Sequence, residues 1–206
     1  MSPAGEPVQP TTPALPEAAA IPLVNVANLL TVSRLILVPV FLITLFAGGG
    51  HATSWRLIAT LVFAVASITD NLDGRLARKL GLVTDFGKIA DPIADKALIG
   101  AALVGLSVLG DLPWWVTLVI AGREIGITLL RFWVIRYGVI AASLGGKWKT
   151  LLQIVGIGLF VLPLPHVVDP GRWLILGAAL VLTVVTGLDY VARAVRLRAQ
   201  GRGVVA

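Results

Sequence analysis

Apolar residues fill most of the chain in long runs, and short clusters of glycine, proline and polar residues separate these runs. A helix that crosses a membrane needs about 20 mostly apolar residues. We expect such helices at residues 28–47, 54–78, 86–109, 114–136, 149–164 and 172–195. The breaks are GGGHATS, the turn at Gly81, GDLP, GVIAASLGGK and LPHVVDPG, which contain the residues that terminate helices. The pattern predicts an all-α membrane protein with six transmembrane helices.

Composition supports this class. Hydrophobic residues make up 57% of the chain and charged residues 14%, which is far from a soluble domain. The chain has no cysteine and two histidines, so disulfides, a thiolate nucleophile and a histidine-rich metal site are excluded, and a metal would need oxygen ligands. The net charge is +6. The basic residues lie at the ends of apolar segments, as expected beside anionic lipid, and we therefore expect no nucleic-acid partner.

The chain divides into three parts. Residues 1–20 hold five prolines and no Lys or Arg, which predicts a disordered tail and not a secretory signal. Residues 21–196 form the six-helix domain, and residues 197–206 form a basic C-terminal tail. The connections after the second and fourth predicted helices, and the tail, are rich in Lys and Arg. By the positive-inside rule these regions, and both termini, are expected to be cytoplasmic.

Carboxylates are concentrated in residues 69–98, at the expected cytoplasmic ends of the second and third helices. Asp70 and Asp73 are one helical turn apart, and so are Asp91 and Asp95. Because the connection between the helices is short, the two pairs can face each other. Four carboxylates at membrane depth are costly unless they are neutralised. Two divalent cations such as Mg²⁺ or Mn²⁺ would neutralise them through oxygen ligands.

Two further residues lie on the stripe of the first carboxylate pair. Gly74 costs a helix about 1 kcal/mol relative to alanine, which is understandable if a ligand approaches the backbone there. Arg78, one turn on, could bind a phosphate in a bidentate manner. The structural alternative is a glycine for helix packing and an arginine at the membrane interface. Asp85, just ahead of the third helix, is interpreted as a helix cap.

The spacing of these residues resembles the signature of the CDP-alcohol phosphotransferase family. The matching positions are Asp70, Asp73, Gly74, Ala77, Arg78, Gly87, Asp91 and Asp95. The segments NLLTVSRLILVP, REIGITLLR and GGKWKT are similar to bacterial members that use glycerol 3-phosphate. The resemblance covers residues 28–153 and, loosely, the six-helix layout.

The resemblance implies a role for each residue of the site. The ligands of two Mg²⁺ or Mn²⁺ ions would be Asp70, Asp73, Asp91 and Asp95. Asp95 would also be the base that deprotonates the acceptor hydroxyl. The residues that bind CDP-diacylglycerol would be Asn28, Thr31, Gly74, Arg78 and Thr84. The resemblance also implies a homodimer in the bacterial inner membrane, with a polar cavity open to the cytoplasm.

A second set of charges bears on the acceptor. Arg123 lies near mid-membrane beside Glu124, and Arg131 is two turns further along the same helix. With Lys147 and Lys149, the arginines would line an anion pocket, which favours an acceptor that is itself a phosphate ester. Glycerol 3-phosphate and inositol phosphate both fit, and the similarity favours the former. The expected products are phosphatidylglycerol phosphate and CMP. An internal Arg–Glu pair and ordinary interface lysines are the structural alternatives.

Three other functions remain open. A sister enzyme would use inositol phosphate, phosphatidylglycerol or serine as the acceptor. A membrane prenyltransferase would also bind diphosphate through Mg²⁺, but such enzymes generally need two separated aspartate motifs. A divalent cation transporter would place acidic residues inside the membrane, but it leaves Gly74, Arg78 and the basic residues unexplained.

Overall fold

The computed structural model describes residues 26–80, 85–134 and 144–202, and every regular element in these ranges is a helix. For residues 26–27, 70–80, 85–92, 95, 144 and 199–202 the description covers the backbone only. The α-helices are α1 (Val26–Phe46), α2 (Thr53–Leu80), α3 (Asp85–Val108), α4 (Trp114–Val134), α5 (Leu144–Val161) and α6 (Asp169–Arg202). Two short 3-10 helices are η1 (Ala47–Gly50) and η2 (His166–Val168). The predicted tail at residues 1–20 lies outside the described ranges.

The described α-helices occupy the segments that the hydrophobic pattern predicts, and the largest differences are at the ends of α5 and α6. α5 begins at Leu144, ahead of the predicted start, because the two glycines that follow continue the helix instead of forming a turn. It ends at Val161, close to Pro163, whose ring disfavours helical backbone in the preceding residue. α6 runs to Arg202, so residues 197–202 of the predicted basic tail continue the helix.

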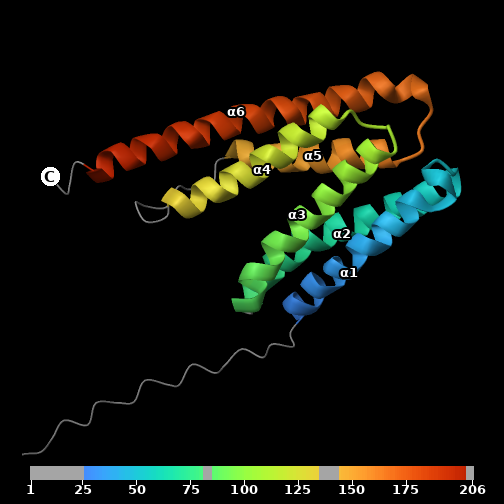
Figure 1. The fold of residues 1–206 in the computed structure, drawn as a ribbon. Helices are drawn as coiled ribbons and strands as arrows, with labels where there is room; N and C mark the ends of the chain where they lie inside the picture. The colour runs from blue at the N-terminus through green and yellow to red at the C-terminus, as the bar shows by residue number, and fades with distance from the viewer. Residues whose placement is uncertain (1–25, 81–84, 135–143, 203–206) are drawn as a thin grey trace, which may run out of the picture.

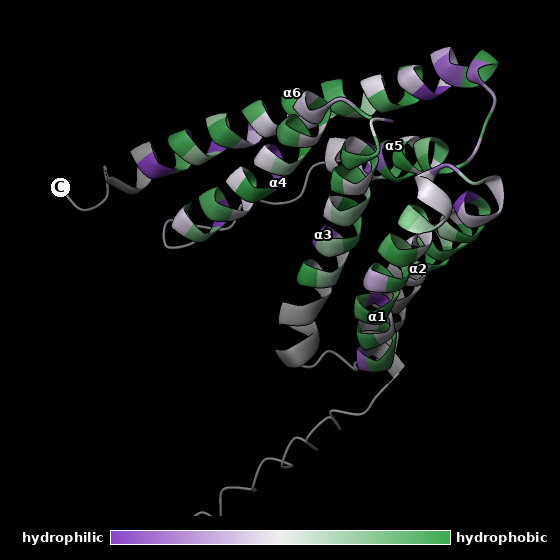
Figure 2. Cartoon of the chain, turned by 45° about the vertical axis from the view of Figure 1, so that its right-hand side comes forward, coloured by the Kyte–Doolittle hydropathy of each residue, from purple (hydrophilic) through white to green (hydrophobic). Residues whose placement is uncertain are grey.

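The helices form two sets that meet at one end. Figure 1 shows α1, α2 and α3 together, and α4, α5 and α6 together, and Figures 1 and 2 show the two sets diverging toward the other end. The connections α1–α2, α3–α4 and α5–α6 lie at the joined end, which we call the loop end. The opposite end carries the C-terminal part of α2 and the start of α3, and we call it the carboxylate end. A buried core that includes Phe41, Phe63, Leu106, Ile120 and Ile157 fills the junction.

Arg56, on α2, joins the α1–α2 and α3–α4 connections to the last turn of α5. It is buried, and it donates Nε to the carbonyl of Gly50 and Nη1 to the carbonyl of Phe160 at 3.3 Å. Its Nη2 pairs with Asp111 in the α3–α4 connection. Gly50 has a φ of +79°, and a Cβ there would lie 2.3 Å from the side chain of Leu109, so glycine is required. These contacts fix how the two sets of helices meet.

Loss of this clamp is expected to destabilise the fold. Arg56→Gln should lower the thermal midpoint by roughly 6 °C or more, because breaking a buried ion pair costs about 3–5 kcal/mol. Tryptophan fluorescence of the protein in a nonionic detergent measures the midpoint. Arg193→Gln is the matched control, since Arg193 pairs with Asp189 at 2.8 Å on the surface of α6 and is half exposed. Equal midpoints for the two variants would contradict a clamp at Arg56.

The outer surface has features of a membrane protein. The segments Asn28–Gly50 and His166–Arg198 are long and apolar enough to cross a membrane, judged by length and composition. Hydrophobic residues run along most of each helix (Figure 2), and on α1 the exposed residues Leu29, Ile36 and Ile43 recur every seven positions and form one outward stripe.

Tryptophans mark both ends of the helices. Trp55, Trp114, Trp115 and Trp173 are exposed at the loop end, and Trp133 and Trp148 are exposed near the opposite ends of α4 and α5. Tryptophan is enriched at the two interfaces of a membrane. On α4, the rise from Trp115 to Trp133 is about 27 Å, close to the ~30 Å thickness of the hydrocarbon core. Arg123 lies about halfway between these two tryptophans.

Candidate functional site

The four predicted metal ligands lie on helical backbone at the carboxylate end. Asp70 and Asp73 are on α2, and Asp91 and Asp95 are on α3. Their side chains are outside the described part of the chain, as are those of Gly74 and Arg78, while Thr84 lies outside it altogether. α3 begins at Asp85 itself. The roles of these residues therefore remain predictions. The backbone shows at which level along the helix axes, which we call depth, each residue lies.

The contact between α1 and α2 sets the depth of the first carboxylate pair. The rings of Phe41 and Phe63 pack with their centroids 5.6 Å apart. Because α1 and α2 are antiparallel, moving seven residues from this contact toward the carboxylate end brings Arg34 level with Asp70. Thr31 is level with Asp73 by the same reasoning.

The contact between α1 and α3 sets the depth of the second pair. A Cβ on Gly105 would lie 2.6 Å from the side chain of Leu45, so the two helices touch there. α1 and α3 run in the same direction, and stepping fourteen residues back along each brings Thr31 level with Asp91. Asp95 is then close to the level of Arg34. Both carboxylate pairs thus lie at one depth, beside the first turns of α1.

At this depth, one face of α1 is buried inside the bundle. Asn28 and Thr31, the predicted nucleotide contacts, are 6% and 1% exposed, so both point into the bundle. Arg34 continues the same stripe and is completely buried. Side chains on a helix slant toward its N-terminus, which carries the Arg34 guanidinium toward the carboxylate end. Arg34 was not among the predicted site residues, although its spacing of three from Thr31 was a usable signal.

The predicted acceptor residues Arg123 and Lys149 lie together, on either side of Glu124. Arg123 Nη1 donates to Glu124 Oε1 at 3.1 Å, and Lys149 Nζ pairs with the same oxygen from α5. Arg123 Nη2 reaches across to Thr186 Oγ1 on α6 at 3.3 Å. Gly187 provides the room, because a Cβ there would lie 3.3 Å from Arg123 Cγ. We call Arg123, Glu124 and Lys149 the basic cluster.

Two buried polar atoms of this region have no hydrogen-bond partner among the described residues. They are Arg123 Nε and Gln153 Oε1. Gln153 is 3% exposed and lies one turn beyond Lys149 on α5. Buried polar atoms are nearly always satisfied in proteins, so an unpaired donor and acceptor at a cluster of charges indicate room for a polar ligand. Gln153 was not among the predicted site residues.

Lys96 connects the carboxylate helix to the basic cluster. It follows Asp95 on α3, and its Nζ donates to Thr128 Oγ1 on α4. Thr128 in turn donates to the backbone carbonyl of Glu124 at 2.7 Å. Lys96 thus spans from the predicted base to the helix that carries Arg123. This contact could not be read from the sequence, because it depends on the relative register of α3 and α4.

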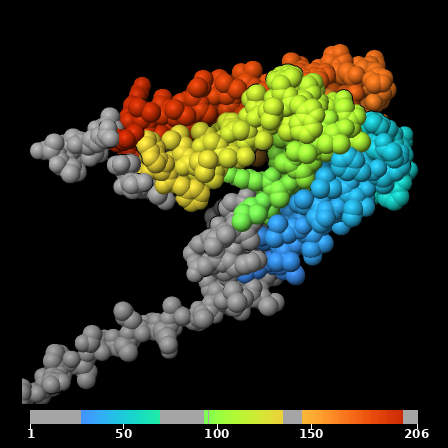
Figure 3. All heavy atoms as spheres, viewed as in Figure 1, coloured from blue at the N-terminus to red at the C-terminus, as the bar shows by residue number. Residues whose placement is uncertain are grey.

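The basic cluster and the aspartate positions lie at similar distances along their helices from the junction of the two sets. A Cβ on Gly158 would lie 3.6 Å from the ring of Phe63, so α5 touches α2 at that point. Lys149 lies nine residues along α5 from this contact, and residue 72 lies nine residues along α2, so both are about 14 Å from it along their helices. The surface is hollowed between α4 and α3 on the face seen in Figure 3. The four aspartates therefore lie on the α1–α3 set of helices, and the basic cluster lies on the α4–α6 set, on the other side of the space between the two diverging sets.

The other two predicted acceptor residues are not part of the basic cluster. Arg131 is exposed and lies over the ring of Tyr190 on α6, with its guanidinium carbon 6.0 Å from the ring centroid. Lys147 is exposed at the start of α5. Both cations are nearer to the carboxylate end than Arg123 and Lys149.

A family model and several known proteins match most of the chain. The model of the CDP-alcohol phosphatidyltransferase family matches residues 24–185. A probable phosphatidylglycerophosphate synthase of Mycobacterium tuberculosis (strain H37Rv) is 59% identical over 172 residues, which cover 84% of this chain and 82% of the relative. The CDP-diacylglycerol–glycerol-3-phosphate 3-phosphatidyltransferase of Bacillus subtilis (strain 168) is 38% identical, covering 81% of this chain and 93% of the relative.

The corresponding enzyme of Haemophilus influenzae is 37% identical over 172 residues, which cover 81% of this chain and 91% of the relative. The matched residues 24–185 contain all of the signature positions and the basic cluster. The resemblance drawn from the signature is thereby confirmed. The chain belongs to the CDP-alcohol phosphatidyltransferase family.

Proposed function

We propose that the chain transfers the phosphatidyl group of CDP-diacylglycerol to glycerol 3-phosphate, giving phosphatidylglycerol phosphate and CMP. The observation that carries this proposal is the set of relatives named for this reaction, at 59% and 37–38% identity over four-fifths of the chain. The buried basic cluster supports it, because an acceptor with its own phosphate needs cations beside the carboxylates.

The four aspartates would hold two divalent cations. The donor set fits, because it consists of carboxylates without cysteine or histidine, which suits Mg²⁺ or Mn²⁺. The backbone fits too, since both pairs lie at one depth on neighbouring helices. Bound there, the cations would neutralise the diphosphate and clamp the attacking and leaving oxygens.

The residues of the site divide the remaining work. Asp95 accepts the proton of the glycerol 3-phosphate primary hydroxyl as its oxygen attacks the phosphorus that carries diacylglycerol, and CMP leaves with the electrons of the broken P–O bond. Gly74 allows the nucleotide to approach the backbone, and Arg78 binds the diphosphate. Thr84 contributes a hydroxyl beside the nucleotide. Positioning and charge account for most of the rate enhancement.

The remaining residues bind the substrates from α1 on one side and from α4 and α5 on the other. Asn28 and Thr31 line the nucleotide pocket on α1, where their burial directs them inward. Arg123 and Lys149 bind the acceptor phosphate within the basic cluster, and Arg131 and Lys147 attract it from the carboxylate end. Arg34 adds a buried positive charge at the depth of the carboxylates.

We further propose six membrane-spanning helices, a homodimer, and a cavity open to the cytoplasm. The two bands of exposed tryptophans support the span, because their spacing on α4 matches the hydrocarbon core. The surplus of Lys and Arg at the carboxylate end supports its cytoplasmic side.

An acceptor panel tests the proposed function. Purified protein supplied with CDP-diacylglycerol and Mg²⁺ is expected to release CMP with glycerol 3-phosphate. Inositol phosphate, serine and phosphatidylglycerol should give no release above background. Release with inositol phosphate but not with glycerol 3-phosphate would assign the chain to a sister reaction. Metal flux into proteoliposomes without any nucleotide would instead identify a transporter.

Arg123 is expected to act on the acceptor. Arg123→Ala should raise the KM for glycerol 3-phosphate by about 10- to 100-fold, because a charge-assisted contact contributes about 1.5–3 kcal/mol. The KM for CDP-diacylglycerol should stay within about threefold of the wild type. Arg193→Ala, on the exposed surface of α6, serves as the control. A variant that weakened only nucleotide binding would show that the basic cluster does not bind the acceptor.

A further inference from the structure

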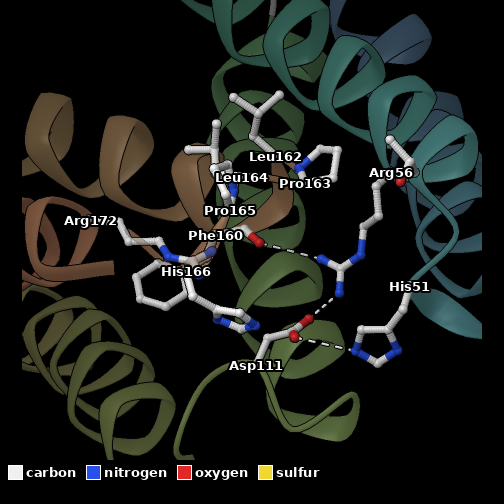
Figure 4. Close-up of a pocket in the computed structure, with 11 residues that line it drawn as sticks. His51, Arg56, Asp111, Phe160, Leu162, Pro163, Leu164, Pro165, His166 and Arg172 are labelled. Atoms are coloured by element: carbon white, nitrogen blue, oxygen red, sulfur yellow. Dashed lines mark hydrogen bonds and ion pairs between the residues drawn. The ribbon is translucent and has the colours of Figure 1, made fainter. Parts of the chain in front are cut away.

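A cavity at the loop end belongs to none of the parts of the proposed site. Its volume is about 480 Å³, within the range of small-molecule sites, which is roughly 300–1,000 Å³. Figure 4 shows His51, Arg56 and Asp111 on one side of it and Phe160, His166 and Arg172 on the other. These residues come from all three connections and the helix ends beside them. The proposed site lies at the opposite end of the helices.

Two aspartates at this cavity each join an arginine to a histidine. Asp111 pairs with Arg56 and with His51 Nε2 at 3.3 Å. Asp169, at the start of α6, pairs with Arg172 and with His166 Nδ1 at 3.1 Å. Asp169 itself is not among the residues that line the cavity, so the lining has two arginines and one carboxylate. The lining itself therefore carries one more positive than negative charge, and Asp169, outside the lining, pairs with Arg172.

Arg172 has one nitrogen without a hydrogen-bond partner among the described residues, whereas each of the three nitrogens of Arg56 has an acceptor. The three nitrogens of Arg56 are taken by Gly50, Phe160 and Asp111. Arg172 gives one nitrogen to Asp169, while its Nε is buried and has no partner among the described residues. Its guanidinium carbon lies 5.1 Å from the ring centroid of Phe160, which holds it in place.

The surroundings of the cavity identify the kind of anion. The ring of Phe160 packs edge-on against Trp173, with centroids 5.1 Å apart, and Trp173 is one of the exposed tryptophans of the loop end. Tryptophans of this kind lie at the level of lipid headgroups. A cationic cavity at that level faces the phosphates of the adjacent leaflet, which accept hydrogen bonds from arginine in a bidentate manner.

We propose that this cavity binds the phosphate of a phospholipid from the leaflet at the loop end, through Arg172 and with His166 at the mouth. The lipid's acyl chains would lie along the apolar outer faces of the helices. The proposal rests on the membrane placement proposed above, but not on the transferase reaction. It assigns a lipid site on the side of the membrane opposite the carboxylates.

The two histidines of the chain allow a selective test, because both line this cavity. The full chain, labelled with ¹⁵N-histidine, is held in a phosphate-free nonionic detergent and titrated with dioctanoyl phosphatidylglycerol. The ring resonances of His166 should shift saturably. Inorganic phosphate should need at least about a tenfold higher concentration, and dioctanoylglycerol, which has no phosphate, should cause no shift.

Two variants complete the test. Arg172→Gln should abolish the shift, whereas Arg193→Gln, which also loses an ion pair with an aspartate on α6, should retain it. If Arg172→Gln fails to fold, Arg172→Lys replaces it, with at least about threefold weaker binding expected because lysine lacks the bidentate fork. Arg172→Gln and Arg172→Lys should both release CMP at the rate of the wild type, which shows that the lipid site is distinct from the proposed transferase site.

Three outcomes would overturn the proposal. They are the absence of a shift with the lipid, an unchanged shift in Arg172→Gln, and an equal response to inorganic phosphate, which would make the cavity a site for the free ion.

Discussion

Asp95→Asn is expected to reduce turnover by about 100- to 10,000-fold while CDP-diacylglycerol binding survives, because a positioned general base contributes about 10²–10⁴-fold and asparagine cannot accept the proton. Asparagine keeps the size of the side chain and one metal-binding oxygen. CMP release at saturating Mg²⁺ measures turnover, and binding of labelled CDP-diacylglycerol to the same preparation measures affinity. A Mg²⁺ titration separates lost base function from lost metal affinity.

Asp85→Asn is the matched control for this prediction. Asp85 lies at the start of the same helix, α3, and was interpreted as a cap. Asparagine caps helices about as well as aspartate, so this variant should keep near-normal activity. Near-normal turnover in Asp95→Asn would exclude Asp95 as the base, whereas equal losses in both variants would indicate a general need for negative charge on α3.

Arg34→Gln is expected to lower kcat/KM by about 100-fold, equivalent to about 2.7 kcal/mol of transition-state stabilisation. Arg34 is completely buried at the depth of Asp70 and Asp95. In the proposed site, a diphosphate and four carboxylates would gather more negative charge than two divalent cations would neutralise, so a further buried cation would stabilise the assembled site. Steady-state CMP release measures the effect, and Arg34→Lys should recover part of it.

Arg56→Gln is the control for Arg34→Gln, because the two arginines are similarly buried at opposite ends of the helices. Both variants should lose stability, but Arg56→Gln should keep kcat/KM within about fivefold of the wild type. The reverse pattern, with activity retained in folded Arg34→Gln, would leave Arg34 with a packing role only.

The hydrophobic pattern predicted most of the helix ends because glycine, proline and charge decide where an apolar helix stops. α4 begins at Trp114 as expected, directly after Pro113. The pattern failed at Leu144, where the two glycines that follow remain helical. Glycine allows a turn but does not require one, and the outcome depends on packing that the local sequence does not contain.

The candidate site was predictable where its residues are close in sequence and not where they meet through packing. Asp70 and Asp73, or Arg123 and Glu124, are related by helical spacing alone. Lys149 joins Glu124 from another helix, and this pairing requires the register of α4 against α5. The cavity at the loop end was missed for the same reason, since its lining comes from three connections.

The two bands of tryptophan also set a length that the bilayer must match. The ~27 Å between Trp115 and Trp133 is slightly less than the ~30 Å of a typical hydrocarbon core. A thicker membrane would have to thin around the protein, at a cost of fractions of a kcal/mol for each ångström of mismatch. In the proposed membrane placement, the protein would thereby favour thinner regions of the membrane.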